Sequence, residues 1–207
     1  SGIKAHVYSI QESNGINRAH LKYFGTGMDD TEKNAAKMQL EGLLDTLTDA
    51  KEYGSILKVE NYNWDLLRRF VAAEETVDQI SLDNMGVEDT AEQLKRLIDI
   101  GETMARKYWV TCTNPPYAGT SNLSETVNNF VKKNYPDSKA DLFAVFIERC
   151  RQLIAGINIC LLASQRAVFQ IDRTANQLYL LAIFDREVVR RDAVICCGIR
   201  RVRGRIT

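Results

Sequence analysis

One short segment, "YWVTCT" at Tyr108–Thr113, constrains the fold of this chain more than any other. Its β-branched and aromatic residues are typical of a strand that is buried on both faces. A buried strand needs partners for its backbone hydrogen bonds, and helix-like segments lie on either side of it in the sequence. Helices that alternate with short buried strands indicate an α/β fold with a mainly parallel sheet.

Apolar periodicity predicts the helices around this strand. The first runs from about residue 29 to Gly54, with Asp29 or Asp30 as its cap. Its apolar stripe consists of Leu40, Leu43, Leu44 and Leu47. Further helices are expected at residues 63–76, 87–108, 124–136 and 138–154. Short strands are expected at residues 5–10 and 55–59, and both tryptophans, Trp64 and Trp109, are expected in the core.

The cysteines and the apolar segments exclude several classes of protein. Five irregularly spaced cysteines without a C-x-x-C pair, far in sequence from both histidines, predict reduced thiols and no metal site. The longest apolar run, residues 178–184, is too short to span a bilayer, and no segment resembles a signal peptide. A cytoplasmic protein without a membrane partner is expected. Because the chain starts with Ser1 rather than Met, it is also expected to be a piece of a longer protein.

Charge is distributed unevenly along the chain. Residues 1–150 carry 17 Lys and Arg against 23 Asp and Glu, whereas residues 151–207 carry 10 against 4. All 11 lysines lie in the first part. Such a shift in composition marks a boundary, and we expect one unit at residues 1–155 and an atypical Arg-rich segment at residues 156–207.

Two adjacent prolines follow the strand directly, in "NPPY" at residues 114–117. Prolines fix backbone angles, so the loop is stiff before anything binds to it. The Asn114 side chain and the Pro115 main chain each offer a carbonyl acceptor, and Tyr117 offers a flat face for stacking. These groups suit a planar ring with an exocyclic amino group. A plain turn is the structural alternative, since Asn-Pro and Pro-Pro are turn dipeptides.

The sequence "TNPPY" resembles motif IV, (D/N/S)-P-P-(Y/F), of the DNA methyltransferases that methylate amino groups with S-adenosylmethionine. The resemblance implies that Asn114 and Pro115 accept hydrogen bonds from the adenine amino group, that Pro116 completes the motif, and that Tyr117 stacks on the flipped base. Two acceptors on a weakly nucleophilic amino nitrogen stabilise the positive charge that develops as the methyl group arrives.

A longer string extends this resemblance. The segment "KNYPDSKADLFAVFIERC" is similar to the large adenine methyltransferases of the BREX phage-defence systems, the PglX type, and the resemblance covers about residues 3–150. It implies double-stranded DNA as a partner, and other phage-defence proteins as further partners. Lys132, Lys133 and Lys139 are candidates for phosphate contact, although a short charge run is also typical of a solvated face. Asp141 is notable but has no assigned role.

The cofactor half of such an enzyme is not found in the sequence. A methyltransferase of this class needs a Gly-rich loop after its first strand and an acidic residue after its second. In "YFGTGM", Gly25 and Gly27 are interpreted as turn glycines. We therefore expect a partial Rossmann-like methyltransferase sheet with a long helical insertion at about residues 12–107, which starts near the third strand and is inactive alone.

The resemblance fades after Cys150, where lysine also disappears. One hypothesis is that residues beyond about Arg151 are the product of a shifted reading frame; the alternative is a genuine basic tail that binds DNA. Two other functions also stay open for the whole chain. It could be a non-catalytic DNA-binding or assembly module, or a degenerate gene product without function.

Overall fold

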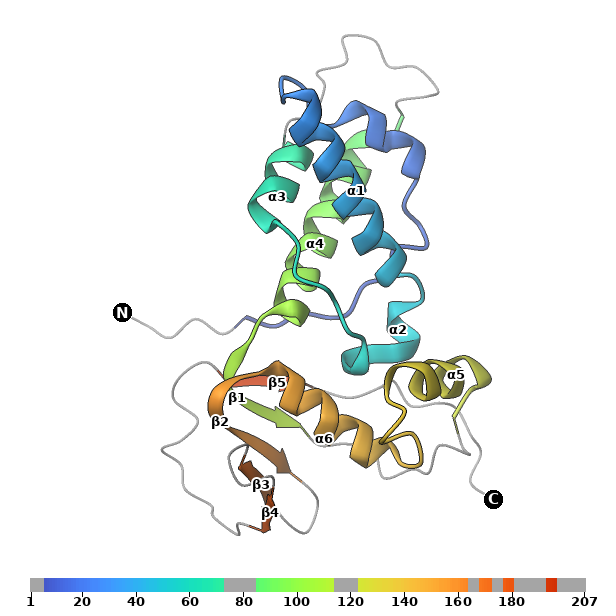
Figure 1. Ribbon diagram of the computed structural model, residues 1–207. Helices are drawn as coiled ribbons and strands as arrows, with labels where there is room; N and C mark the ends of the chain where they lie inside the picture. The colour runs from blue at the N-terminus through green and yellow to red at the C-terminus, as the bar shows by residue number, and fades with distance from the viewer. Residues whose placement is uncertain are drawn as a thin grey trace. The chain divides into compact units, whose positions relative to one another are not determined.

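The computed structural model describes residues 6–72, 85–113, 123–163, 168–172, 177–180 and 193–196. The chain divides into two compact units (Figure 1). The helical unit comprises Ser1–Lys51 and Lys58–Ala105, and the sheet unit comprises Glu52–Leu57 and Arg106–Thr207. The expected insertion at residues 12–107 and the expected boundary near residue 155 stay predictions.

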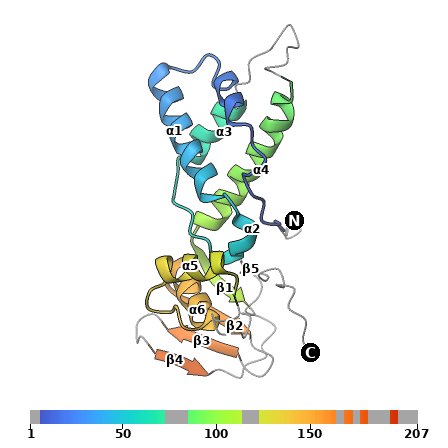
Figure 2. The same cartoon turned by 90° about the vertical axis from the view of Figure 1, so that its right-hand side faces the viewer.

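The helical unit is built from helices that pack along apolar stripes. Its elements are η1 (Arg18–Tyr23), α1 (Asp30–Thr46), α3 (Trp64–Ala72) and α4 (Val87–Ala105). Asp29 caps α1 by accepting a hydrogen bond from the Thr31 amide at 3.0 Å, and all four predicted leucines of the stripe are buried. The helices α1, α3 and α4 lie side by side in both ribbon views (Figures 1 and 2).

Three local expectations for the first sixty residues are wrong. The first helix stops at Thr46, because Asp49 takes a left-handed φ of 53° before the short α2 (Ala50–Tyr53) begins. The described residues 6–10 form no strand, and Val7 is 91% exposed. Residues 55–59 also form no strand; η2 (Gly54–Ile56) is a 3₁₀ turn. A short apolar run becomes a strand only where a partner strand accepts its hydrogen bonds.

The sheet unit contains one mixed sheet of five strands. They are β1 (Tyr108–Thr113), β2 (Ile154–Ala163), β3 (Val168–Asp172), β4 (Gln177–Leu180) and β5 (Ala193–Cys196), in the order β4-β3-β2-β1-β5. The strand β1 pairs in parallel with both β2 and β5, whereas β3 pairs antiparallel with β2 and with β4. The predicted strand at Tyr108–Thr113 is therefore confirmed as an interior strand, but the sheet is parallel only around it.

The burial of β1 differs along its length. Thr111 and Thr113 are buried, whereas Trp109 is 65% exposed and Cys112 is partly buried. The expectation that Trp109 lies in the core is wrong, and Trp64 is only partly buried. An aromatic residue in a strand-like run does not show that its side chain is buried, because burial depends on which other elements pack over that part of the strand.

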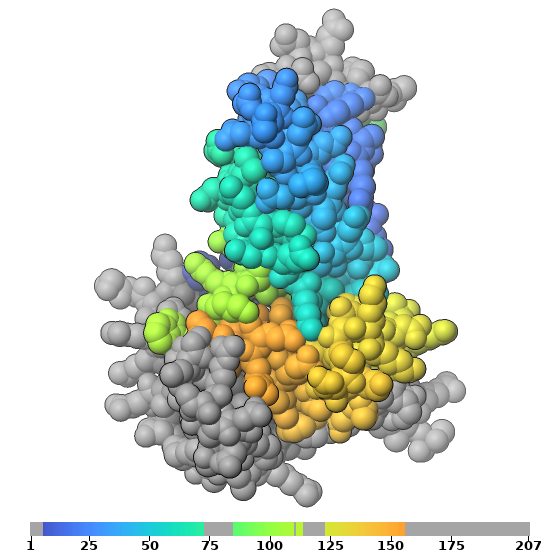
Figure 3. Space-filling model, in the orientation of Figure 1, coloured from blue at the N-terminus to red at the C-terminus, as the bar shows by residue number. Residues whose placement is uncertain are grey.

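Two helices of the sheet unit follow β1 in the sequence, α5 (Glu125–Asn134) and α6 (Leu142–Leu153). Ser124 and Asp141 cap them. The helix α6 packs against β1 and β2, and the space-filling view shows α5 and α6 as adjoining parts of one face (Figure 3). In the part of the chain that the structure describes, no helix has the length and apolar character to cross a membrane.

Candidate active-site region

The predicted base-binding residues Asn114, Pro115, Pro116 and Tyr117 lie outside the described residues, so their roles stay predictions. The structure does describe the residues on either side of them. Thr113 ends β1 on one side, and Leu123 precedes α5 on the other. These two flanks are the described residues nearest to the motif on either side.

The upstream flank is the carboxyl end of an interior strand. Thr113 pairs with Leu162 of β2 and with Cys196 of β5, and it is 2% exposed. Because the three strands are parallel, their carboxyl ends meet at one edge of the sheet. Ligands of open α/β sheets bind at such edges. The motif therefore begins one residue beyond the edge at which a ligand is expected.

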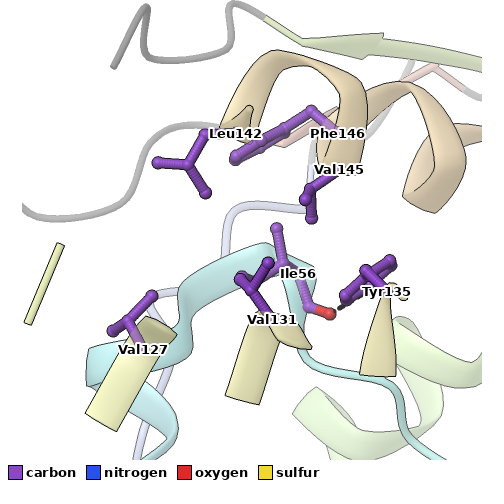
Figure 4. Packing of buried hydrophobic residues seen from close by; sticks show 7 residues of the cluster. All are labelled: Ile56, Val127, Val131, Tyr135, Leu142, Val145 and Phe146. Atoms are coloured by element: carbon purple, nitrogen blue, oxygen red, sulfur yellow. Dashed lines mark hydrogen bonds between the residues drawn. The ribbon is translucent and has the colours of Figure 1, made fainter. Parts of the chain in front are cut away.

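The downstream flank is held by a small hydrophobic core. Ser124 caps α5 by accepting a hydrogen bond from the Val127 amide at 3.3 Å. Leu123 is partly buried and packs against a cluster of seven buried residues. The cluster consists of Ile56, Val127, Val131, Tyr135, Leu142, Val145 and Phe146. Figure 4 shows side chains of α5 and α6 converging on Ile56 from two sides.

Two buried polar side chains bind the turn that carries Ile56. The Tyr135 hydroxyl donates to the carbonyl of Ile56, shown as a dashed line in Figure 4. The Arg149 guanidinium donates through Nε to the carbonyl of Ser55 at 3.2 Å. Tyr135 is fully buried and Arg149 is 7% exposed. Burial raises the pKa of Tyr135, so its hydroxyl stays a hydrogen-bond donor at neutral pH.

Two polar residues between α5 and α6 have structural roles that the sequence analysis did not assign. Ser138 donates through Oγ to Glu148 Oε2 at 2.8 Å. Asp141 caps α6 by accepting a hydrogen bond from the Phe143 amide at 2.8 Å. The signal for Asp141 was available, because an Asp directly before an apolar helical run is a typical N-cap. Tyr135 and Arg149 could not be assigned, because their partners lie 79 and 94 positions away.

The three candidate DNA-binding lysines lie on the surface of this same region. Lys132 and Lys133 occupy the last turn of α5, and Lys139 precedes α6; all three are exposed. None of them forms an ion pair or a side-chain hydrogen bond with another described residue. Cations in a last turn also stabilise the helix dipole, so Lys132 and Lys133 have a structural role available. Their contact with DNA stays a prediction.

The two glycines of "YFGTGM" lie in a turn of the helical unit. Gly25 and Gly27 have φ values of 74° and 75°, which confirms them as turn glycines. A Cβ at Gly25 would lie 2.7 Å from the Phe70 ring, and the Gly25 amide donates to the Phe70 carbonyl at 3.0 Å. The backbone at Gly25 is therefore packed against a core side chain, whereas a Cβ at Gly27 would meet no atom within 4 Å. Among the residues that the structure describes, no group of His, Cys, Asp and Glu could hold a metal ion.

Comparison with known proteins places this geometry in context. The family model described as Eco57I restriction-modification methylase matches residues 22–182. In an alignment of 105 residues, which covers 50% of the chain, the chain is 36% identical to the adenine-specific methyltransferase PglX of Lacticaseibacillus casei (strain Zhang). In an alignment of 131 residues, which covers 63% of the chain, it is 28% identical to the adenine-specific methyltransferase BrxX of Escherichia coli O9:H4 (strain HS). The chain spans about a tenth of these relatives, 9% and 10% of their respective lengths.

The family match extends beyond the point at which the resemblance was expected to fade. It runs past Cys150 to residue 182 and so includes β2, β3 and β4. The hypothesis of a shifted reading frame beyond Arg151 stays a prediction, which the nucleotide sequence of the gene would decide.

Proposed function

Because the chain belongs to the Eco57I restriction-modification methylase family, we propose that it is part of a DNA adenine-N6 methyltransferase and that residues 114–117 receive the target adenine. The observation that carries the proposal is the place of this motif directly after β1, an interior strand whose carboxyl end meets those of two parallel neighbours. The adenine-specific methyltransferases PglX and BrxX support the choice of base.

In this proposal the loop recognises the exocyclic amino group of a base that has left the helical stack. The Asn114 side chain and the Pro115 carbonyl accept its two hydrogens, which orients the nitrogen lone pair and favours a pyramidal amino group. Tyr117 stacks on the ring of the flipped base. Lys132, Lys133 and Lys139 contact the phosphate backbone in the same proposal, because each presents an exposed ammonium group.

S-adenosylmethionine is the methyl donor in this proposal, but we assign no described residue to it. In the sequence no Gly-rich loop follows a buried strand, and Gly25 of the turn in the helical unit is packed on Phe70. We therefore expect the chain alone to bind DNA without methylating it. Double-stranded DNA is the proposed partner, and marking of host DNA in phage defence, together with other proteins of such a system, is the proposed setting.

The proposed adenine site is tested with two bases that differ only in the exocyclic amino group. Two DNA duplexes are compared, one with adenine and one with unsubstituted purine, each opposite an abasic site so that flipping is easy. Two lost hydrogen bonds correspond to a preference for adenine of about tenfold. Asn114→Ala removes one of the two acceptors and should reduce that preference to about threefold. The matched control is Asn34→Ala, which removes an exposed amide from α1 and should leave the preference unchanged. Equal affinity of the unmodified chain for both duplexes would refute the proposal.

The non-catalytic DNA-binding module is the second candidate, and the charge of the sheet unit favours it. Residues 52–57 and 106–207 together carry 16 Lys and Arg against 9 Asp and Glu. Such a module binds both duplexes equally, and its affinity falls steeply with salt. A degenerate gene product, in contrast, shows neither DNA binding nor cooperative unfolding.

A further inference from the structure

We propose that an exposed patch at the beginning of β1 binds single-stranded nucleic acid, with a base stacked on Trp109 and phosphate groups in contact with neighbouring cations. The patch consists of Trp109, Arg106, Lys107 and Arg151, and we call it the Trp109 patch. All four residues belong to the sheet unit. The inference goes beyond the proposed function, because it concerns the beginning of β1 rather than the motif after its end, and it requires no adenine.

The Trp109 side chain is exposed although its strand is interior. Trp109 is 65% exposed, whereas Thr111 and Thr113, at alternate positions of the same strand, are 0% and 2% exposed. Alternate residues of a strand point to the same face of the sheet, so the cover over this face ends before Trp109. The indole forms no hydrogen bond and no ring contact with another described residue. Its ring is therefore available for stacking on a flat ligand.

The pairing of β1 with both of its neighbours is interrupted at Trp109. The pairs on either side join its sequence neighbours to Ile154 and Ile159 of β2, so that Trp109 alone lies opposite residues 155–158. Pairing with β5 begins only at Val110. Irregularities of this kind redirect a side chain, and in known proteins they are frequent next to functional sites. The exposure of Trp109 thus coincides with a break in the regular sheet.

Three cations lie near the beginning of this strand. Lys107 donates through Nζ to the Gln152 carbonyl in the last turn of α6, which places the end of that helix beside the beginning of β1 (Figure 1). Arg106 and Arg151 are the sequence neighbours of these two residues, and both are exposed. Neither arginine forms an ion pair or a side-chain hydrogen bond with another described residue. Both guanidinium groups are therefore available to an anionic ligand.

The segments that carry these cations contain no acidic residue. Neither residues 106–113 nor residues 149–155 include an Asp or a Glu. Nucleic-acid interfaces are much more positive than interfaces between proteins, whose cores are depleted of charge. An aromatic ring among cations is typical of sites for single strands, because every base has a flat face and every nucleotide has a phosphate. The bases of a duplex are already stacked on each other, so the observations favour a single strand.

A thymine oligonucleotide tests the Trp109 patch without involving the adenine site. The unmodified chain should bind a fluorescein-labelled oligothymidylate of about 15 nucleotides, measured by fluorescence anisotropy. Trp109→Ala should weaken binding about tenfold, because it removes the partner of one stacked base, whereas Trp109→Phe keeps a ring and should retain most of the affinity. The matched control is Met38→Ala, which removes a side chain that is 69% exposed in α1 and should leave the affinity unchanged. Circular dichroism verifies that each variant is folded.

The salt dependence of binding tests the two arginines. Two phosphate contacts of a single strand contribute about 1.4 to the steepness with which log affinity falls with log salt concentration. Arg106→Gln combined with Arg151→Gln should reduce the steepness by about this amount. The matched control is Arg69→Gln combined with Arg96→Gln, which removes the same charge from exposed positions of the helical unit and should leave the steepness unchanged.

Trp109 also reports directly on its ligand, since Trp64→Phe leaves it as the single tryptophan. Its fluorescence should fall when oligothymidylate is added, because a stacked base quenches the indole. Oligoglutamate, which has charge without bases, should neither quench it nor bind with similar affinity. Dependence of oligoglutamate binding on Trp109 would overturn the proposal in favour of an acidic protein partner. Absence of oligothymidylate binding, or losses no larger than those of the controls, would also overturn it. The preference for adenine over purine decides the proposed function separately.

Discussion

The helical unit and the sheet unit treat their buried polar groups differently. In the helical unit, Ser13 Oγ donates to the Leu44 carbonyl at 2.6 Å, and His20 lies within hydrogen-bonding distance of Thr90 and Asn17. In the described part of the sheet unit, three buried side-chain oxygens have no hydrogen-bond partner within the protein, and no such atom occurs in the described part of the helical unit. They belong to Ser55, Thr111 and Asn128. Ordered water is the usual partner of such buried oxygens, so polar groups that need water are found in the sheet unit and not in the described part of the helical unit.

The two units also differ in net charge, since the helical unit is acidic and the sheet unit is basic. The helical unit, residues 1–51 and 58–105, carries 11 Lys and Arg against 18 Asp and Glu, whereas the sheet unit carries 16 against 9. Phosphate is repelled by the first and attracted by the second. Most of the positive excess of the sheet unit lies in residues 151–207, which carry 10 Lys and Arg against 4 Asp and Glu, whereas residues 52–57 and 106–150 carry 6 against 5.

The largest expected effect concerns the apolar core on which the helical unit depends. Phe70 is fully buried, and its ring packs on Phe24 and against Gly25. Phe70→Ala should lower the free energy of unfolding by about 3–5 kcal/mol, because it leaves a cavity between close-packed elements. Urea denaturation measures the change. A loss below about 1 kcal/mol would mean that the core collapses around the cavity and that the helical unit is looser than described.

In the sheet unit, Arg149→Met is expected to cause the largest loss of stability among the polar substitutions. The substitution keeps an apolar stem but leaves the Ser55 carbonyl without its donor. We expect unfolding to become easier by about 2–3 kcal/mol, since the lost hydrogen bond is buried and its donor is charged. The same denaturation experiment checks it, and Arg149→Lys is the control. An unchanged midpoint would show that another donor or water replaces the guanidinium.

Thr90→Val tests the polar network of the helical unit. The Asn17 oxygen accepts from the Ala19 amide, so its amide nitrogen donates to His20 Nε2. The His20 Nδ1 proton is then donated to Thr90 Oγ1 at 2.8 Å. Valine has nearly the same shape but no oxygen, so we expect a loss of about 1–2 kcal/mol. Thermal unfolding should show it, whereas Thr31→Val at an exposed position should have little effect.

The stability of the chain at alkaline pH tests the burial of the Tyr135 hydroxyl in the sheet unit. Burial raises the pKa of Tyr135 in the folded chain, whereas in the unfolded chain it ionises near pH 10, at about the ordinary value. Its contribution to stability is therefore complete below about pH 10 and is lost as the pH rises above it, by about 1.4 kcal/mol per pH unit. Tyr135→Phe should lose less stability than the unmodified chain between about pH 10 and 11. Parallel curves for both proteins would contradict this assignment.

The smallest expected effect concerns a surface ion cluster. Arg68 bonds Asp99 at 3.0 Å and also bonds Glu102, and the two carboxylates raise the pKa of Arg68. The Arg68 side chain is 39% exposed, so the solvent screens these pairs. Arg68→Met should cost at most about 1 kcal/mol, less than Arg149→Met. If the two substitutions proved equal, the contrast between exposed and buried arginines in the two units would be lost.

Local patterns in the sequence determined much of this protein. The leucine spacing in α1, the cap at Asp29 and the apolar period of α4 each depend on residues within a few positions of one another, so a single segment contains all the information. The strand at Tyr108–Thr113 was equally clear from its composition. The string around residues 114–150 also sufficed to indicate the methyltransferase family, whereas the roles of residues 114–117 stay predictions.

Only the tertiary structure decided which distant segments meet. Residues 6–10 and 55–59 have apolar patterns like that of β1, but only β1 finds parallel partners on both sides. Trp109 is exposed although the strand around it is interior. Tyr135 and Arg149 bind carbonyls of a turn 79 and 94 positions earlier in the chain. A backbone carbonyl has no signature in the sequence, so the residues that bind it are identified only after the chain has brought the two together.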